Sequence, residues 1–277
     1  MDDSRLPIPL PVKREVRQRC GFGCVFCGLP LYEYDHLVPY AEVEEHDPEN
    51  LVLLCATHHR EKTSGLLTSD QVDAARKSPC NIEKGETHPY ELHYEGKSCE
   101  ARIGSNSITW PELRDGSAVA GILVDDTPIV GFSVDRGRLL LTVQLLNAEN
   151  ELLVQIVENE LILSTVPWDV EFAGRRLTVR HGAGDIFVGM TFEPPSRVVV
   201  DRGHLWRNGV QLNVTPSDLH VAGALHMAGC VVSDCSVGVA IGSSQLGGGG
   251  IFMPVAQRQA FEPSEETEVR IIRMTTA

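Results

Sequence analysis

Residues 24–62, CVFCGLPLYEYDHLVPYAEVEEHDPENLVLLCATHHREK, hold most of what the sequence says about architecture and chemistry. They contain a C-x-x-C pair, an Asp-His pair, an isolated Asn and a C-x-x-H-H cluster. Cys and His are the ligands that zinc prefers, and Asp and His are common in hydrolytic sites. The stretch therefore predicts a small metal-bound unit that could also hold a hydrolytic site.

Two ligand pairs predict a structural zinc ion. Cys24 and Cys27 form a C-x-x-C knuckle, and Cys55 and His58 repeat this spacing at the start of a predicted helix. A tetrahedral Cys3His set suits zinc, and a small unit with few apolar residues needs such an ion to fold. Cys20 is an alternative fourth ligand, although its three-residue gap to Cys24 fits less well.

Four polar residues of the stretch are not needed by that zinc: Asp35, His36, Asn50 and His59. His59 directly follows His58, so on a helix it is rotated by about 100° and faces another direction. The two histidines are therefore expected to serve two different metal ions.

The spacing of these residues resembles the HNH endonuclease family. Asn50 lies fourteen residues after the D-H pair, and His59 lies nine residues further on, just after a C-x-x-H. The segments RCGFGCVFCG, EYDH and LLCATHHREK are similar to a subgroup of that family with an accessory zinc. The resemblance covers about residues 13–68 and implies a ββα-metal core that acts on DNA.

The resemblance also implies roles for individual residues. His36 would be the general base, and Asn50 would orient its ring through the hairpin backbone. Asp35 and His59 would hold one catalytic cation, Mg²⁺ or Mn²⁺, against the scissile phosphate. The second zinc pair of the family is commonly C-x-x-C, whereas here it ends in His58. An exchange of roles between His58 and His59 therefore stays open.

Local patterns predict the elements around these residues. Apolar and aromatic residues at 31–34 and 37–40 flank the Asp-His pair, as in a short hairpin strand, and residues 50–54 predict the next strand. Residues 57–62 predict a short helix, and a capping box at Thr68 and Gln71 predicts a second one over residues 70–77. Lys62 is interpreted as a helix-surface charge and His46 as a solvated loop residue.

The remainder of the chain predicts an all-β domain, so the fold class is α+β. Short β-branched and aliphatic segments recur at spacings near ten residues, which is typical of a sandwich or barrel. The small residues of 221–241 would also suit a β-solenoid. The predicted division is a zinc-stapled HNH domain over 1–79, a linker over 80–100 and the β domain over 101–277. His204, His220 and His226 show no metal-ligand spacing and are expected to be ordinary surface or core histidines.

The charge limits how this protein can bind DNA. The formal net charge of the 277 residues is −14, and residues 1–79 hold nine basic against thirteen acidic residues. Five of these acids lie between Glu42 and Glu49. Because phosphate neutralisation supplies most sequence-independent DNA affinity, the chain alone is expected to bind DNA weakly. The β domain is therefore expected to recruit or control the nuclease through oligomerisation, partner docking or ligand sensing.

No run of about 18 apolar residues suggests a membrane span, and the N-terminus lacks the apolar core of a signal peptide. The expected location is the cytoplasm, with no membrane partner. The favoured function is a metal-dependent DNA endonuclease, suited to bacterial defence against foreign DNA. The alternative is an inactive, zinc-stabilised nucleic-acid-binding or scaffold protein.

Overall fold

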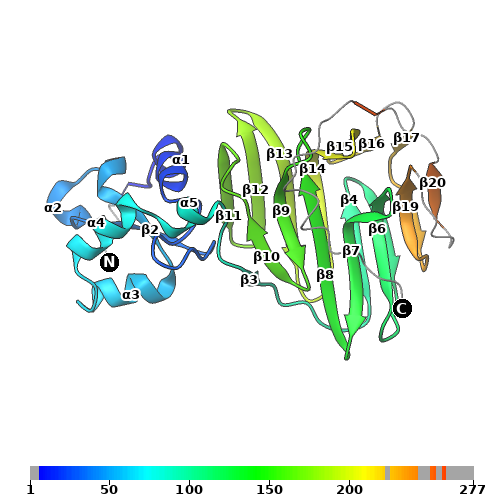
Figure 1. Ribbon diagram of the computed structural model, residues 1–277, viewed down its shortest axis with the longest axis horizontal. Helices are drawn as coiled ribbons and strands as arrows, with labels where there is room; N and C mark the ends of the chain where they lie inside the picture. Colours follow the sequence, from blue (N-terminus) through cyan, green and yellow to red (C-terminus); the bar gives the residue numbers. More distant parts are fainter. Residues whose placement is uncertain (1–5, 222–224, 243–249, 254–257, 260–277) are drawn as a thin grey trace. The chain divides into compact units, whose positions relative to one another are not determined.

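The computed structural model describes residues 6–221, 225–242, 250–253 and 258–259. The chain divides into two compact units, one of Met1–Pro89 with Leu163–Ala173 and one of Tyr90–Ile162 with Gly174–Ala277. Every α-helix of the described residues belongs to the first unit, and the second is built of strands (Figure 1). The predicted α+β class, with a small N-terminal unit and a larger all-β domain, is confirmed.

The stretch predicted as a linker contains regular structure. Residues 80–100 include α5 (Cys80–Lys84), β3 (Tyr90–Glu91) and the start of β4 (Cys99–Ile103). They divide between the two units after Pro89. Residues 1–5 and 260–277 of the predicted domains lie outside the described residues.

The first unit is built on a strand pair followed by a helix. β1 (Glu33–His36) and β2 (Leu51–Leu54) are antiparallel, with Asp35 opposite Val52 and His36 opposite Leu51. Helix α3 (Ala56–Thr63) begins directly after Cys55. Residues 37–40 do not continue the strand, because Pro39 starts a short helix. The other helices are α1 (Leu10–Arg19), α2 (Tyr40–Val43), the 3-10 helix η1 (Pro48–Asn50) and α4 (Ser69–Lys77). None of the described helices is long and apolar enough to span a membrane.

The core of this unit is centred on β2. All four residues of β2 are fully buried, as a continuous apolar run predicts for a strand covered on both faces. Val16 of α1 and Val72 of α4 pack against them with Val25. This is a small apolar core, so a further stabilising element is expected on physical grounds.

Helix α4 begins as the sequence predicts. The Thr68 hydroxyl accepts a hydrogen bond from the Gln71 backbone N–H, and the Gln71 side chain accepts one from the Thr68 backbone N–H. The predicted capping box is therefore confirmed, with the helix starting one residue earlier than expected.

A segment distant in sequence completes the first unit. Strand β11 (Asp169–Ala173) brings Asp169 to Arg17 of α1, and the guanidinium donates two hydrogen bonds to the carboxylate, of 2.8 and 2.7 Å. Both side chains are almost completely buried. Arg17 also donates to the Tyr34 hydroxyl at 2.9 Å. The Arg17 guanidinium thus connects β11 and α1 to β1, the strand that carries Asp35 and His36.

The second unit consists largely of antiparallel meanders. β6 to β9 pair in sequence order, as do β12 to β17. Strand β14 is long enough to have different partners along its length: Arg197–Val200 pair in parallel with β4, and Gly203–Arg207 pair with β15. The described strands of the unit from β5 onward are β5 (Asn106–Trp110), β6 (Ala118–Val124), β7 (Thr127–Asp135), β8 (Arg138–Leu146), β9 (Leu152–Val157), β10 (Glu160–Leu163), β12 (Arg176–Gly182), β13 (Asp185–Glu193), β14 (Arg197–Arg207), β15 (Val210–Val214), β16 (Leu219–Val221), β17 (Leu225–Met227), β18 (Val231–Ser233), β19 (Val237–Ile241) and β20 (Ile251–Met253).

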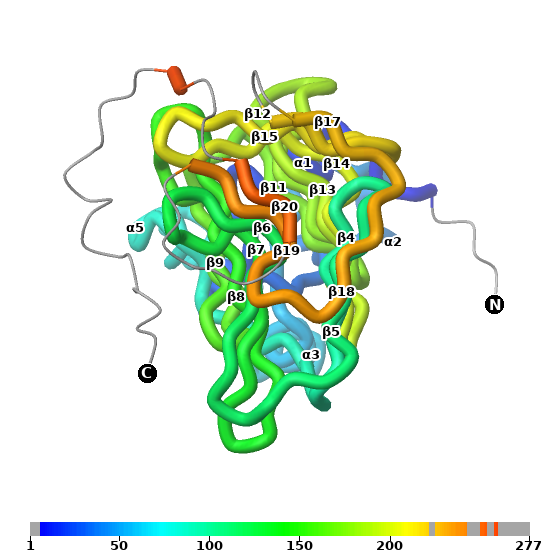
Figure 2. Tube along the Cα trace, turned by 90° about the vertical axis from the view of Figure 1, so that its right-hand side faces the viewer, coloured from blue at the N-terminus to red at the C-terminus, as the bar shows by residue number. Residues whose placement is uncertain are grey.

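The small-residue region pairs in parallel with strands much earlier in the chain. β18 lies beside β5 and β19 beside β6, and β19 also pairs in parallel with β20 (Figure 2). This stacking has the local character of solenoid coils. Most other pairings in the unit are antiparallel, as the sandwich or barrel prediction requires.

The buried ion pair gives a test of how the first unit is held together. Asp169→Ala leaves the Arg17 guanidinium buried without its main counter-charge, and we expect the free energy of unfolding to fall by about 3–5 kcal/mol. Thermal denaturation followed by circular dichroism measures the loss. The control is Glu171→Gln, because Glu171 is partly exposed and contacts Arg17 at 3.4 Å. Equal melting of Asp169→Ala and wild type would show that the pair does not stabilise this unit.

Candidate metal centre and active site

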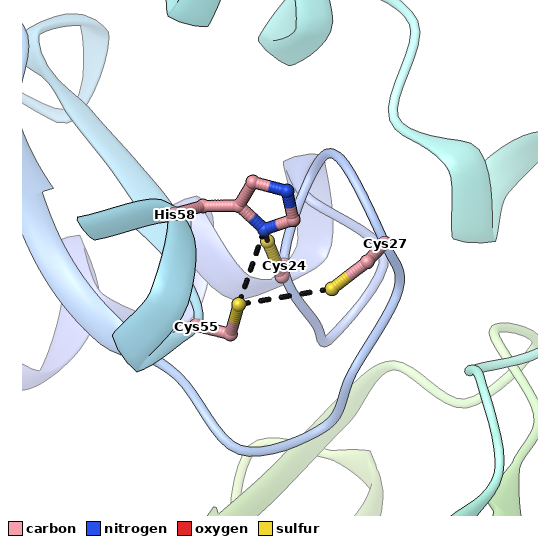
Figure 3. Close-up of side chains that lie close together, drawn as sticks. All are labelled: Cys24, Cys27, Cys55 and His58. Carbon is pink, nitrogen blue, oxygen red and sulfur yellow. Dashed lines mark hydrogen bonds between the residues drawn. The ribbon is translucent and has the colours of Figure 1, made fainter. Parts of the chain in front are cut away.

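Four side chains from two parts of the first unit meet at one point. Cys24 and Cys27 lie on the loop after α1, Cys55 immediately precedes α3, and His58 lies in its first turn. Their ligand atoms all lie within 4.8 Å of one another (Figure 3). The structure thus brings together the four residues that the sequence predicts as zinc ligands.

The spacing of these atoms fits a tetrahedral ion. Cys27 Sγ and Cys55 Sγ are 3.8 Å apart, and His58 Nδ1 lies 3.1 Å from Cys55 Sγ and 3.3 Å from Cys24 Sγ. Ligands at about 2.3 Å from zinc in a tetrahedron are separated by roughly 3.5–3.8 Å. The Phe26 ring stacks on His58 at 4.9 Å and limits how the imidazole can turn.

The Cys24 and Cys27 thiols share a hydrogen bond that shifts their two pKa values in opposite directions. A hydrogen bond from the Cys27 thiol lowers the pKa of Cys24 to about 4, which favours the thiolate. Burial instead raises the pKa of Cys20 to about 11. Cys20 lies outside the four-residue cluster, so the structure does not place it as the fourth ligand.

A buried amide that the sequence did not reveal supports the knuckle. Asn81 of α5 donates hydrogen bonds to the carbonyls of Gly21 and Gly28, at 2.9 and 3.1 Å. Gly28 has a φ of +77°, and a Cβ there would overlap the Asn81 carbonyl oxygen. The sequence did not mark Asn81 as a supporting residue, because it falls in the stretch predicted as a linker. Only the glycine-rich loop that contains Gly21 and Gly28 indicated a close backbone contact.

A second group of possible metal ligands consists of His59 on α3 and two carboxylates on β1, and it faces away from the Cys3His cluster. His59 Nε2 lies 3.4 Å from Asp35 Oδ1, and His59 Nδ1 lies 3.0 Å from Glu33 Oε2. Glu33 and Asp35 are two residues apart on β1, so both carboxylates point to the same side of the strand. A ring that gives one nitrogen to a carboxylate and turns the other toward a possible metal is the usual arrangement of a metal-binding histidine.

Lys62 belongs to this site and is not a free surface charge. Its ammonium group lies 2.5 Å from Asp35 Oδ2 and also donates to the His36 carbonyl. Only 15% of the Lys62 side chain is exposed. The interpretation of Lys62 as an ordinary helix-surface residue was therefore wrong. Its position one turn after His59 on α3 places it opposite β1.

His36 is buried and contacts a second histidine. His36 Nε2 lies 3.2 Å from His46 Nδ1, and His46 Nε2 lies 2.6 Å from the Leu6 carbonyl oxygen. Tyr40 stacks on the His46 ring at 4.7 Å. The interpretation of His46 as a solvated loop residue was wrong, because the α2–η1 connection folds back over β1.

These contacts determine which nitrogen of each ring carries hydrogen in the neutral state. A carbonyl only accepts hydrogen bonds, so His46 Nε2 is the donor and its Nδ1 has the lone pair. His36 Nε2 must then be the donor to His46. The lone pair of neutral His36 is therefore on Nδ1.

Asn50 binds the backbone that follows His36. Its side chain donates to the Val38 carbonyl at 2.9 Å and accepts from the Val38 N–H at 2.7 Å. The Asn50 carbonyl accepts from the Leu37 N–H at 2.9 Å. These three bonds fix the backbone directly after the Asp-His pair, which is the contact expected of this residue.

Zinc content tests the Cys3His cluster. We expect one zinc ion per chain in this cluster, and Cys24→Ser should lose that ion and unfold the first unit, because binding and folding are coupled in such sites. Metal analysis and thermal melting measure both effects. Cys20→Ala is the matched control, as it removes a buried thiol from the same loop without removing a ligand. An equal loss of zinc in both variants would contradict the assignment.

Comparison with known proteins agrees with this geometry. The family model described as HNH endonuclease matches residues 18–65. This range includes the Cys3His cluster and also Asp35, His36, Asn50 and His59. No curated protein and no solved structure matches the chain. The N-terminal part of the chain therefore carries an HNH endonuclease domain.

Proposed function

We propose that the first unit hydrolyses phosphodiester bonds in DNA. His36 is the general base, and Asp35 with His59 holds one divalent cation, Mg²⁺ or Mn²⁺. The observation that carries the proposal is the pairing of His59 Nε2 with Asp35 Oδ1 at 3.4 Å, on the strand that also holds the buried His36. The zinc cluster has a structural role, because its four ligands leave no position for substrate.

The donor set of Asp35 and His59 fits a hydrolytic cation. One carboxylate oxygen and one imidazole nitrogen leave most coordination positions for water and phosphate oxygen, and mixed ligands accept Mg²⁺ and Mn²⁺. When bound, the cation neutralises charge on the phosphate and the leaving oxygen. Glu33 holds the His59 ring so that Nε2 faces Asp35.

His36 removes the proton from the attacking water. The water oxygen bonds to phosphorus, its proton passes to His36 Nδ1, and the bond between phosphorus and the 3′ oxygen breaks. The leaving oxygen then takes a proton from solvent. A neutral imidazole can accept a proton near neutral pH, and Asn50 keeps the backbone behind the ring in place.

Lys62 brings a positive charge into a site with two carboxylates. It binds Asp35 Oδ2, which leaves Oδ1 on the side of His59. It also holds the His36 carbonyl, so one ammonium group connects the metal-binding residue and the base. We infer that Lys62 positions both residues.

We propose that the second unit recruits the acidic first unit to DNA. A chain with a net charge of −14 attracts DNA poorly, so recruitment through a partner or through self-assembly would raise the local substrate concentration. A nuclease that acts only when recruited suits a role in bacterial defence. We assign this recruiting role to the β domain.

Plasmid cleavage tests the proposed activity. We expect the wild type to nick or cut DNA with Mg²⁺ or Mn²⁺, and His36→Ala to lower the rate by about 10²–10⁴-fold, because the general base is gone. His88→Ala is the control, since His88 is an exposed histidine of the same unit outside the site. Cleavage by wild type and His36→Ala at equal rates would refute the proposal. No cleavage by either would favour the inactive binding or scaffold protein.

A second pair of variants tests the role of His46. His46→Phe keeps an aromatic ring beside Tyr40 but removes the acceptor for His36 Nε2, and we expect the rate to fall by about 10–100-fold. His46→Asn places an oxygen near the former Nδ1 and should retain most of the activity. Nitrogen NMR of the His36 ring should show a fixed Nε2–H tautomer in wild type and a mixture in His46→Phe. Equal behaviour of the two variants would show that His46 only fills space.

A further inference from the structure

A second group of potential metal ligands lies in the β unit, far in sequence from the HNH domain. His220 of β16 and His226 of β17 are directly opposite in an antiparallel pair. Asp218 directly precedes β16, and its carboxylate contacts His226. The neighbouring positions Leu219, Val221 and Met227 are buried, whereas both histidines are exposed. The three polar side chains therefore share the outer face of the β16–β17 pair.

The three side chains are in contact. The two imidazole rings stack with centroids 4.2 Å apart, and His226 Nε2 lies 2.5 Å from Asp218 Oδ1. One ligand atom from each of the three residues can be chosen so that all lie within 4.8 Å of one another. Residues opposite in an antiparallel pair have their Cβ atoms about 4.5–5.5 Å apart, which suits chelation of one ion by two imidazoles.

The carboxylate is held in place by a tight turn. The Asp218 N–H donates to the Thr215 hydroxyl at 3.1 Å, and the Thr215 N–H donates to the Asp218 carbonyl at 2.9 Å. The hydroxyls of Ser217 and Thr215 both donate to Asp218 Oδ2. These hydrogen bonds hold the Asp218 carboxylate with Oδ1 directed toward His226.

We propose that Asp218, His220 and His226 form a binding site for a divalent first-row transition-metal ion, separate from both metal sites of the first unit. Two imidazoles and one carboxylate are ligands that Fe²⁺, Ni²⁺, Cu²⁺ and Zn²⁺ accept, with positions left open for water or an anionic oxygen. The rings must turn from the stack for both nitrogens to face one ion, which exposed side chains do rapidly. The negative charge of the chain favours a cation at this face.

His204, which lies on a neighbouring strand in register with His220, provides a matched control for the proposed ligands. His204 of β14 is opposite Asn213 of β15, which is in turn opposite His220. The His204 ring is also exposed, and its Nδ1 lies 2.8 Å from the Asn213 side-chain oxygen. It is one further strand from His220 and outside the three-residue cluster. Loss of His204 therefore removes a nearby exposed imidazole without removing a proposed ligand.

Calorimetric titration of the zinc-loaded full chain with Ni²⁺ tests the site. We expect a binding step in wild type and in His204→Ala, and a step at least about 10–100-fold weaker in His220→Ala, His226→Ala and Asp218→Asn, because each loses a direct ligand. Asp218→Asn preserves the size of the side chain at the turn, and circular dichroism checks the fold of every variant. The inference is overturned if His220→Ala binds as wild type does, if His204→Ala loses as much affinity, or if wild type binds only above about 1 mM. Plasmid cleavage is a separate readout, so this result does not depend on nuclease activity.

Discussion

The placement of two adjacent imidazoles in two different donor sets is the constraint on which the first unit depends. His58 faces three sulfur atoms, and His59 faces the carboxylates of β1. A helix separates consecutive side chains by about 100°, so this divergence requires only that α3 begins at the right residue and keeps its orientation. Cys55 lies at this junction: it follows β2, is the N-cap of α3 and belongs to the Cys3His cluster. A structural ion at that junction would set the position of His59 relative to Asp35, and a small core alone would hold it less rigidly.

Residue type and spacing were enough to predict the Cys3His cluster and the strand-strand-helix order, because each Cys or His pair is local and each element has a strong pattern. The supporting residues were not predictable in the same way. Glu33, His46 and Asn81 act through contacts that depend on how loops fold back in space, and their side chains carry no spacing signal of their own. His46 lies in an acidic stretch with the composition of a solvated loop. Its contact with His36 depends on the α2–η1 connection packing over β1, which sequence patterns do not specify.

The β unit shows the same limit on a larger scale. Alternation and turn residues predict strands, but they do not predict partners, and the parallel pairing of β18 with β5 joins segments more than 120 residues apart. Sequence spacing also gave no sign of the group formed by Asp218, His220 and His226. His220 and His226 are six residues apart, which matches no familiar ligand motif, and only the hairpin register makes them neighbours. Ligand sets formed across strands therefore need the register, whereas sets formed within a knuckle or a helix turn do not.

Electrostatics separates the chemistry of the candidate active site from the delivery of DNA to it. Around the candidate active site, Glu33 and Asp35 are offset by Lys62 and by the cation that Asp35 and His59 would hold, so the site can be locally neutral while the chain stays strongly acidic. Local neutrality permits chemistry on a phosphate that has already arrived, but it does not supply the long-range attraction that brings DNA to a protein. Because these two requirements are separate, an acidic HNH protein can be chemically competent and still inactive on free DNA. Control would then act on delivery of the substrate, leaving the geometry of His36, Asp35 and His59 unchanged.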